Sequence, residues 1–165
     1  MREIPYNEAA PLLIDRLAHG GVFLNTPGNT MTIGWGSIGV YWGRPVFVAL
    51  VRPQRDTYPR IQEAGQFTVS IPLGDDLKKE LAFAGTQSGR DVNKFEGHGL
   101  TAVPAQKVAC PIVQECALHI ECVTRYAQTL DGVGMDAKIL NHAYPEQDFH
   151  TLFYGEIVAC YRTDL

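Results

Sequence analysis

Residues that interrupt helices and strands are spread along the whole chain, which predicts many short elements. Sixteen glycines and ten prolines punctuate the 165 residues into many short segments. These residues do not cluster into a linker, and the sequence contains no internal repeat. Because the length is close to that of one typical domain of roughly 150 residues, residues 1–165 are expected to form a single domain.

The balance of residue types favours a globular protein that does not span a membrane. Hydrophobic residues make up 45% of the chain and charged residues 19%. The longest apolar run, Val46–Val51, is much shorter than the roughly 20 residues that a membrane span requires. Arg2, Glu3 and Glu8 precede Pro11 in the first segment, a pattern unlike a secretory signal. We therefore expect no membrane partner and a cytoplasmic location.

Charge and cysteine spacing exclude two further classes. Because the net charge is −4, a basic face for nucleic acid is not expected. The four cysteines form no C-x-x-C pair and have no histidine at zinc-ligand spacing, so neither a metal site nor a disulfide framework is predicted. Cys116 and Cys122 alternate with Leu118 and Ile120, which favours core packing over a redox role.

The periodicity of apolar residues predicts a mainly β fold with helical insertions. Helices are expected over residues 7–17 and 75–84, the latter ended by Gly85 or Gly89, and a further helix is expected to start at a cap formed by Asp56 or Thr57 and to run through residues 61–64. Strands are expected over residues 22–24, 31–35, 46–51, 67–71, 113–124, 134–140 and 152–161. In the 113–124 strand, His119 and Glu121 alternate with the apolar positions, so this strand is expected to be half-buried. An antiparallel barrel accounts best for this set of elements.

A glycine-rich stretch invites a dinucleotide-binding interpretation that the neighbouring residues exclude. Gly34, Gly36 and Gly39 spell G-x-G-x-x-G, but residues 40–45 cannot start the helix whose N-terminus would hold a pyrophosphate. The glycines alternate with aromatic residues such as Trp35. Two interpretations remain: a flat ring lies close to this backbone, or a twisted barrel strand carries core aromatics.

The next segment concentrates positive charge in an acidic chain. Arg44, Arg52, Arg55 and Arg60 face only one carboxylate, that of Asp56. Two of these arginines, Arg52 and Arg55, precede a helix N-terminus together with a threonine, a combination of donors that phosphate prefers. The alternative is a solvated turn with surface arginines.

A third stretch, residues 85–95, is small and polar and contains two cations, Arg90 and Lys94. It could wrap a polyol or an anion. The alternative is a helix end followed by a turn, with Asp91 as a cap and Phe95 in the core.

These stretches, in this order, resemble the flavin reductase-like FMN-binding split barrel family, and most closely its flavoredoxin branch. The resemblance spans roughly residues 21–161. It is carried by Asn29-Thr30-Met31-Thr32, Trp35-Gly36, Val51-Arg52-Pro53 with Arg55, Thr57 and Tyr58, Leu81-Ala82-Phe83, Gly85-Thr86, Ser88-Gly89-Arg90-Asp91-Val92, Lys94-Phe95, Tyr126-Ala127-Gln128 and Tyr154-Gly155-Glu156-Ile157-Val158.

The resemblance implies an antiparallel split β-barrel that binds FMN, usually as a homodimer with cofactor sites at the interface. It places the ring edge around Thr30, Met31 and Thr32, with Trp35, Gly36 and Ser37 nearby, and the phosphate against Arg52, Arg55 and Thr57. Asn29 and Tyr58 are further expected cofactor contacts. Gly85, Ser88, Gly89 and Lys94 would close over the ribityl chain or the ring. His150 resembles a family histidine on the substrate side of the ring and is the candidate catalytic residue.

The resemblance also implies a function. The protein would pass electrons from NADH or NADPH through FMN to free flavin or to an acceptor protein. Two alternatives are a flavoredoxin-type carrier without its own nicotinamide activity and a barrel that binds no flavin. Asp56 stands where relatives often show tyrosine, and a carboxylate beside a phosphate would weaken binding. We therefore expect the Asp56 side chain to cap the following helix.

Overall fold

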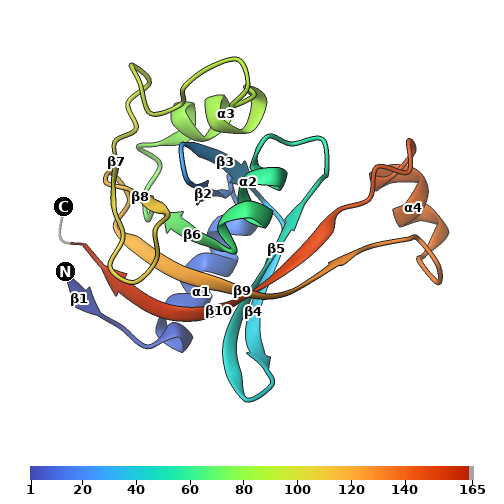
Figure 1. Cartoon of the computed structure of the whole chain (residues 1–165), viewed down its shortest axis with the longest axis horizontal. Helices are drawn as coiled ribbons and strands as arrows, with labels where there is room; N and C mark the ends of the chain where they lie inside the picture. The colour runs from blue at the N-terminus through green and yellow to red at the C-terminus, as the bar shows by residue number, and fades with distance from the viewer. Residues whose placement is uncertain (164–165) are drawn as a thin grey trace.

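The computed structural model describes residues 1–163, which form one large antiparallel sheet and a small ribbon (Figure 1). The strand order of the large sheet is β3-β2-β6-β9-β10-β5-β4, with β1 beside β10. Its strands are β1 (Arg2–Glu3), β2 (Val22–Thr26), β3 (Asn29–Ile33), β4 (Gly36–Tyr41), β5 (Arg44–Val51), β6 (Gln66–Ile71), β9 (Leu118–Thr129) and β10 (Thr151–Arg162). The ribbon pairs β7 (Ala102–Pro104) with β8 (Pro111–Val113).

The sheet curls into a barrel that stays open along one seam. Strands β3 and β4 stand at opposite ends of the strand order, although only Gly34 and Trp35 separate them in the sequence. The sheet must therefore curve until these two edges approach each other, with no ladder between them in the described chain. The predicted antiparallel split β-barrel with helical insertions is confirmed.

Aromatic side chains from opposite parts of the sheet fill the barrel. Phe47 of β5 and Phe67 of β6 are fully buried, with ring centroids 6.4 Å apart. Gly155 of β10 lies against this pair, and a Cβ atom there would come within 2.7 Å of the Cβ of Cys122. The absence of a side chain at position 155 therefore lets β10 pass close to the packed core.

Four helices lie outside the barrel sheet. Helix α1 (Tyr6–Ala18) buries Ala9 and Leu13, α2 (Thr57–Ala64) connects β5 to β6, and α3 (Lys78–Thr86) packs on β3. Helix α4 (Ala137–Ala143) lies on an arm that extends from the ends of β9 and β10 to the right of the barrel (Figure 1). None of the described helices combines the length and apolar character needed to cross a bilayer.

The strand expected over residues 134–140 is wrong, because most of this segment is helix α4. The Asp136 side chain accepts hydrogen bonds from the backbone N–H groups of Lys138 (2.9 Å) and Ile139 (3.2 Å). Gly134 adopts a φ of +75° in the preceding turn, which ends extended structure. An aspartate followed by good helix formers is a helix start, and this signal outweighs the apolar alternation.

The third helix also departs from its expected bounds. It runs from Lys78 to Thr86 instead of 75–84, and Gly85 lies inside it. A Cβ atom at Gly85 would be 3.3 Å from the Cβ of Thr32, so the glycine permits close packing of α3 on β3. Neither Gly85 nor Gly89 ends the helix.

The half-buried strand expected over residues 113–124 is wrong in two respects. Strand β8 ends at Val113 and β9 begins at Leu118, so Cys116 lies between strands, although it is fully buried. His119 and Glu121 of β9 are also fully buried, because the loop 105–109 and the ring of Tyr161 cover their side of the sheet.

The cysteines of the described chain are all free and buried. Burial raises the pKa of the Cys110 and Cys160 thiols to about 12, so both stay protonated at neutral pH. Cys122 is fully buried on β9, as the packing interpretation predicts. A buried, protonated thiol is a poor nucleophile and acts as a small apolar group.

The buried His119 makes stability depend on pH. Its Nδ1 atom lies 3.1 Å from the hydroxyl of Ser70, and burial lowers its pKa to about 4. Because the unfolded chain binds this proton more readily, the contribution is complete above about pH 6.5 and is lost as the pH falls toward 4. We expect the free energy of unfolding to fall by about 2 to 3 kcal/mol from this group between pH 7 and 4.5.

Urea unfolding of the wild type and of His119→Asn at both pH values measures this contribution. The variant keeps a polar atom for Ser70 but has no titrating ring, so its loss of stability should be smaller by that amount. Equal losses in the two proteins would show that His119 does not titrate on unfolding.

Candidate functional site

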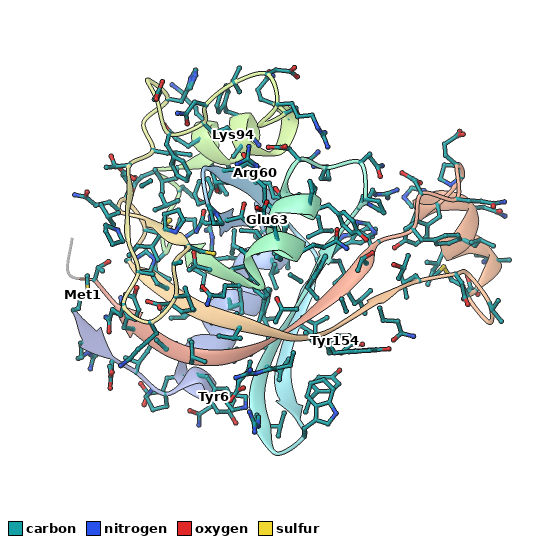
Figure 2. All side chains as sticks on the ribbon, in the orientation of Figure 1. Met1, Tyr6, Arg60, Glu63, Lys94 and Tyr154 are labelled. Atoms are coloured by element: carbon teal, nitrogen blue, oxygen red, sulfur yellow. The ribbon has the colours of Figure 1, made fainter. Side chains whose placement is uncertain are left out.

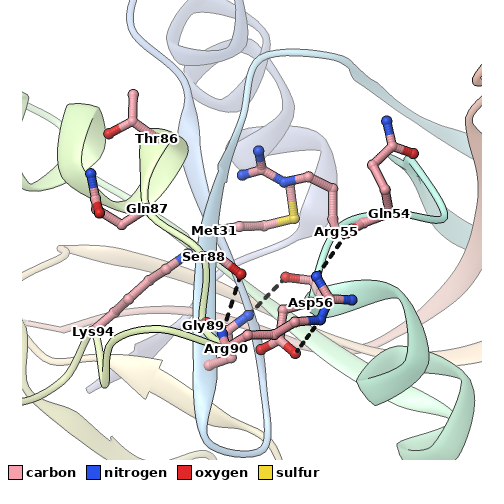
Figure 3. Close-up of a pocket in the computed structure, with 12 residues that line it drawn as sticks. Met31, Gln54, Arg55, Asp56, Thr86, Gln87, Ser88, Gly89, Arg90 and Lys94 are labelled. Atoms are coloured by element: carbon pink, nitrogen blue, oxygen red, sulfur yellow. Dashed lines mark hydrogen bonds and ion pairs between the residues drawn. The ribbon is translucent and has the colours of Figure 1, made fainter. Parts of the chain in front are cut away.

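A polar cavity of about 230 Å³ opens where the N-terminus of α2 meets the loop that follows α3 (Figure 3). We call it the polar cavity. It is lined by Asn29, Met31, Gln54, Arg55, Asp56, Thr57, Thr86, Gln87, Ser88, Gly89, Arg90 and Lys94.

Arg55 enters this cavity from the turn that connects β5 to α2. The backbone N–H of Arg55 donates to the carbonyl of Arg52 (3.1 Å), and the Arg55 carbonyl accepts from the N–H of Tyr58 (3.0 Å). Its Nη2 atom donates to the carbonyl of Gly85 in α3 (3.0 Å), which fixes the guanidinium beside the cavity. The remaining N–H groups of this planar fork are suited to oxygen atoms of an anion.

Thr57 and Asn29 form the cavity floor. Thr57 begins α2 and is 1% exposed, and its hydroxyl oxygen accepts a hydrogen bond from Nδ2 of Asn29 (3.0 Å). Since a hydroxyl has one hydrogen to donate, that hydrogen remains for a group in the cavity. Oδ1 of Asn29 is buried and has no partner within the described chain. The floor therefore offers both a free donor and a free acceptor.

Lys94 is the most buried cation of the site. It is 2% exposed, and its Nζ atom donates to the carbonyls of Thr30 on β3 (2.8 Å) and Ala84 on α3 (2.9 Å), at the place labelled in Figure 2. Burial lowers the pKa of Lys94 to about 8, assisted by the charge of Arg55 and opposed by that of Asp56. An ammonium has three N–H groups, so one remains for a ligand.

The expectation that the Asp56 side chain caps α2 is wrong. Its backbone is already helical (φ −58°, ψ −27°), whereas a capping side chain needs an extended residue. Instead its Oδ2 atom accepts from Nε of Arg60 (2.8 Å), and Oδ1 lies 3.9 Å from Nε of Arg90. Arg90 also donates through Nη1 to the carbonyl of Gln54 (2.9 Å), which holds the loop after α3 over the cavity (Figure 3).

The donors of the polar cavity suit a phosphate monoester. Three cations, Arg55, Arg90 and Lys94, line it against one carboxylate, Asp56, which is already paired with Arg60. The N-terminus of α2 adds its partial positive charge at the same place. Charge and hydrogen-bond donors therefore converge on one small volume, as an anion requires.

A second cavity, of about 220 Å³, adjoins the first through a shared side chain, that of Met31. We call it the tryptophan cavity, because Trp35 forms one wall and is 51% exposed. Its lining residues are Met31, Thr32, Ile33, Gly34, Trp35, Leu50, Arg52 and His150. The wall is more apolar than that of the polar cavity and includes a flat indole ring.

His150 is uncharged at neutral pH. Burial lowers its pKa to about 4, assisted by the positive charge of Arg52 and opposed by Asp148. Its Nδ1 atom shares a hydrogen bond with the hydroxyl of Tyr144 (2.7 Å), and its ring centroid is 5.1 Å from that of Trp35. His150 therefore faces the tryptophan cavity as a hydrogen-bonding group without a charge.

The structure does not bring Arg52 to the anion site predicted for it together with Arg55. Arg52 lines the tryptophan cavity, and its Nη2 atom donates to the carbonyl of Ala143 (2.8 Å). Its Nη1 atom donates to the carbonyl of Asp148 (3.1 Å) and pairs with the Asp148 carboxylate. The N–H groups of Arg52, which was expected to bind phosphate, therefore donate to oxygen atoms of Ala143 and Asp148 instead.

Comparison with known proteins identifies the family. The sequence profile of the Flavin reductase like domain matches residues 15–164, nearly the whole chain. The chain belongs to the flavin reductase-like family.

One relative by sequence is similar over most of this chain. A protein of Archaeoglobus fulgidus without an assigned function is 32% identical over 131 residues, which are 79% of this chain and 63% of that protein. This flavin reductase-like chain thus spans less than two thirds of the length of the curated relatives it matches.

Two solved structures illustrate the fold. Flavoredoxin of Desulfovibrio vulgaris superimposes with a TM-score of 0.69 at 26% identity, covering 88% of this chain and 70% of its own. An NADH:FAD oxidoreductase of Streptomyces globisporus superimposes with a TM-score of 0.65 at 18% identity, covering 87% of this chain and 75% of its own, a likeness of fold alone.

The flavin reductase-like motifs converge on the two adjoining cavities. Of the residues expected to contact the cofactor, the polar cavity gathers Asn29, Met31, Arg55, Thr57, Ser88, Gly89 and Lys94. The tryptophan cavity gathers Met31, Thr32, Trp35 and Arg52, together with the candidate catalytic residue His150. Gly89 lies directly above Asn29, because a Cβ atom at Gly89 would be 2.5 Å from Oδ1 of Asn29. A side chain at position 89 would therefore displace the side chains of Asn29 and Asp56.

Five expected residues line neither cavity. Gly36 packs against Phe47, Tyr58 packs against Phe153 with ring centroids 5.7 Å apart, and Ser37 is exposed on β4. Thr30 and Gly85 contribute through backbone carbonyls that hold Lys94 and Arg55. The polar cavity also contains five residues that were not expected as cofactor contacts: Gln54, Asp56, Thr86, Gln87 and Arg90. Three of them, Thr86, Gln87 and Arg90, stand in the small, polar stretch 85–95, which was the available sequence signal.

Proposed function

We propose that this flavin reductase-like chain is an FMN-dependent oxidoreductase that transfers electrons from NADH or NADPH to free flavin or an acceptor protein. The observation that carries the proposal is the contact of the two cavities at Met31. One cavity offers cations and hydroxyls for a phosphate, and the other offers a flat, more apolar wall. A flavin mononucleotide has these two ends, and its ring supplies the hydride and electron chemistry.

The residues divide the work of binding. Arg55, Thr57 and the N–H groups of α2 hold the phosphate, while Lys94 and the loop of residues 87–90 cover the middle of the ligand. Trp35 excludes water from one side of the tryptophan cavity, and His150 presents a neutral hydrogen-bonding ring to its substrate side. No side-chain nucleophile is required of the protein.

The proposal includes a homodimer with its sites at the interface. Tyr41, Trp42 and Tyr126 are 41%, 60% and 49% exposed and pack around Tyr154, which is labelled in Figure 2. Exposed aromatic clusters of this kind are typical of protein interfaces. Tyr126 and Tyr154 lie on β9 and β10, and Tyr41 and Trp42 lie at the turn between β4 and β5, so this cluster is the surface on which we propose that a second copy packs.

Light scattering during gel filtration measures the dimer. We expect a mass about twice the 18.2 kDa of one chain. The variant Trp42→Glu should shift the mass toward one chain, because it places a charge in the contact. A monomeric wild type at micromolar concentration would contradict the dimer.

Steady-state kinetics test the activity. A reductase oxidises NADH or NADPH catalytically when free FMN or FAD is supplied. The likeness to flavoredoxin at 26% identity supports a second candidate, a carrier that keeps FMN bound and needs a separate reductase. Catalytic nicotinamide oxidation by the purified chain with free flavin as the acceptor, and with no second protein, would favour the reductase. A flavin-loaded protein that is reduced only when a separate reductase is added would favour the carrier.

A further inference from the structure

We propose that Arg52 is a positioning residue that holds the arm, residues 130–150, against the tryptophan cavity and thereby fixes the place of His150. The contacts between Arg52 and the arm belong to the chain itself and need no ligand. The consequence for turnover rests on the proposed function, because it assumes that the reacting ring lies in the tryptophan cavity.

The guanidinium of Arg52 bonds to two separate parts of the arm. Nη2 donates to the carbonyl of Ala143 (2.8 Å), and Nη1 donates to the carbonyl of Asp148 (3.1 Å) and pairs with the Asp148 carboxylate. The cation also lies 5.1 Å from the ring centroid of Tyr144. Gln54, two residues after Arg52, adds a hydrogen bond to Oδ2 of Asp148 (3.0 Å).

Helix α4 depends on such outside support. It has seven residues, and none of these described residues is buried. A helix this short is unstable on its own in water. Ala143 is its last residue, so the bond from Arg52 satisfies a carbonyl that lacks an intrahelical partner, and the positive charge stands at the favourable end of the helix dipole.

The same contacts lead directly to His150. Tyr144, whose ring lies beside the Arg52 cation, shares the 2.7 Å hydrogen bond with Nδ1 of His150. Asp148 stands two residues before His150, and β10 begins at Thr151. A guanidinium that contacts both Tyr144 and Asp148 therefore fixes the imidazole that is hydrogen-bonded to Tyr144, and with it the wall that the imidazole forms.

Hydrogen exchange of the α4 amides tests the structural step without any flavin. We expect Arg52→Gln and Asp148→Asn each to accelerate exchange at residues 140–144 by about tenfold or more, because each removes a charge-assisted bond to the arm. Arg44→Gln is the matched control: Arg44 pairs with Glu156 (2.8 Å) on the barrel, away from the arm, and should leave α4 unchanged. Exchange in Arg52→Gln and Asp148→Asn equal to that of the wild type would overturn the proposal.

Flavin binding and kinetics separate this role from phosphate binding. Arg52→Gln should leave the ratio of FMN to riboflavin affinity within about twofold of the wild type, since the phosphate lies in the other cavity. Because both variants remove the same ion pair, the change in kcat, or in the KM for the nicotinamide, should have the same sign in Arg52→Gln as in Asp148→Asn. A selective loss of FMN affinity in Arg52→Gln would overturn the proposal and make Arg52 a phosphate ligand.

Two safeguards keep the result decisive. If Arg52→Gln does not fold, Asp148→Asn is compared with the wild type instead, because this substitution removes the same ion pair from the side of the arm. If the wild type binds no flavin, the proposed function fails, whereas the exchange of α4 still decides whether Arg52 holds the arm.

Discussion

Replacing Arg55 with alanine is expected to weaken FMN binding by one to two orders of magnitude and to leave riboflavin binding within about twofold. Arg55 is fixed by the carbonyl of Gly85 and directs its free N–H groups into the polar cavity. A charge-assisted hydrogen bond contributes about 1.5 to 3 kcal/mol, which gives this change in affinity. Riboflavin lacks the phosphate and therefore lacks the contact. Titration followed by flavin fluorescence measures both affinities.

Arg44→Ala is the control for this experiment. It removes the same side chain from a surface pair with Glu156, outside both cavities. We expect FMN and riboflavin affinities close to those of the wild type. If Arg55→Ala weakened the two flavins equally, or neither of them, Arg55 would not bind the phosphate.

Replacing Glu121 with glutamine is expected to lower the free energy of unfolding by about 3 to 5 kcal/mol. The buried carboxylate accepts hydrogen bonds from the backbone N–H groups of Gln106, Lys107 and Val108 and from the hydroxyl of Tyr161, at 2.6 to 3.1 Å. A glutamine side chain offers one oxygen and would turn an NH₂ group toward some of these donors. Each buried donor left without a partner costs about 1 to 3 kcal/mol.

Glu115→Gln provides a matched control for the stability measurement. Glu115 undergoes the same change of chemistry but accepts a single, more exposed hydrogen bond, from the N–H of Thr101 (3.0 Å). Its effect on urea unfolding should stay below about 1 kcal/mol. Losses of similar size in the two variants would show that the buried carboxylate does not anchor the loop 105–109.

The elements with strong apolar periodicity were predictable from the sequence. The helix at 7–17 and the strands at 22–24, 46–51, 67–71 and 152–161 all occur, with bounds that differ by a few residues. Their patterns are set by burial in the barrel, which acts on each segment as a whole. Helix α4 was missed because it has no buried residue and therefore no apolar face to display. Only Asp136, its cap, marks its start.

The burial of His119 and Glu121 on β9 was not predictable from the alternation of apolar and polar residues alone. The alternation correctly placed His119 and Glu121 on one face, but the segments that bury this face come from elsewhere in the chain. Periodicity reports which residues share a face. It does not report what packs on that face.

The candidate site was predictable in its location more than in its individual contacts. Arg52 and Arg55 stand three residues apart in a tight turn, where the N–H of Arg55 bonds to the carbonyl of Arg52. Spacing within a turn does not determine which cavity each side chain faces. The partners of Arg52, at Ala143 and Asp148, lie about ninety residues farther along the chain and follow no motif.

Titration of the purified protein with FMN and with riboflavin, followed by flavin absorbance, tests most directly whether the two cavities form one flavin site. The structure leads us to expect one FMN bound per chain, retained through gel filtration, with an affinity at least about tenfold higher than that for riboflavin. A protein that takes up no FMN, or that binds the two flavins equally well, would contradict the account.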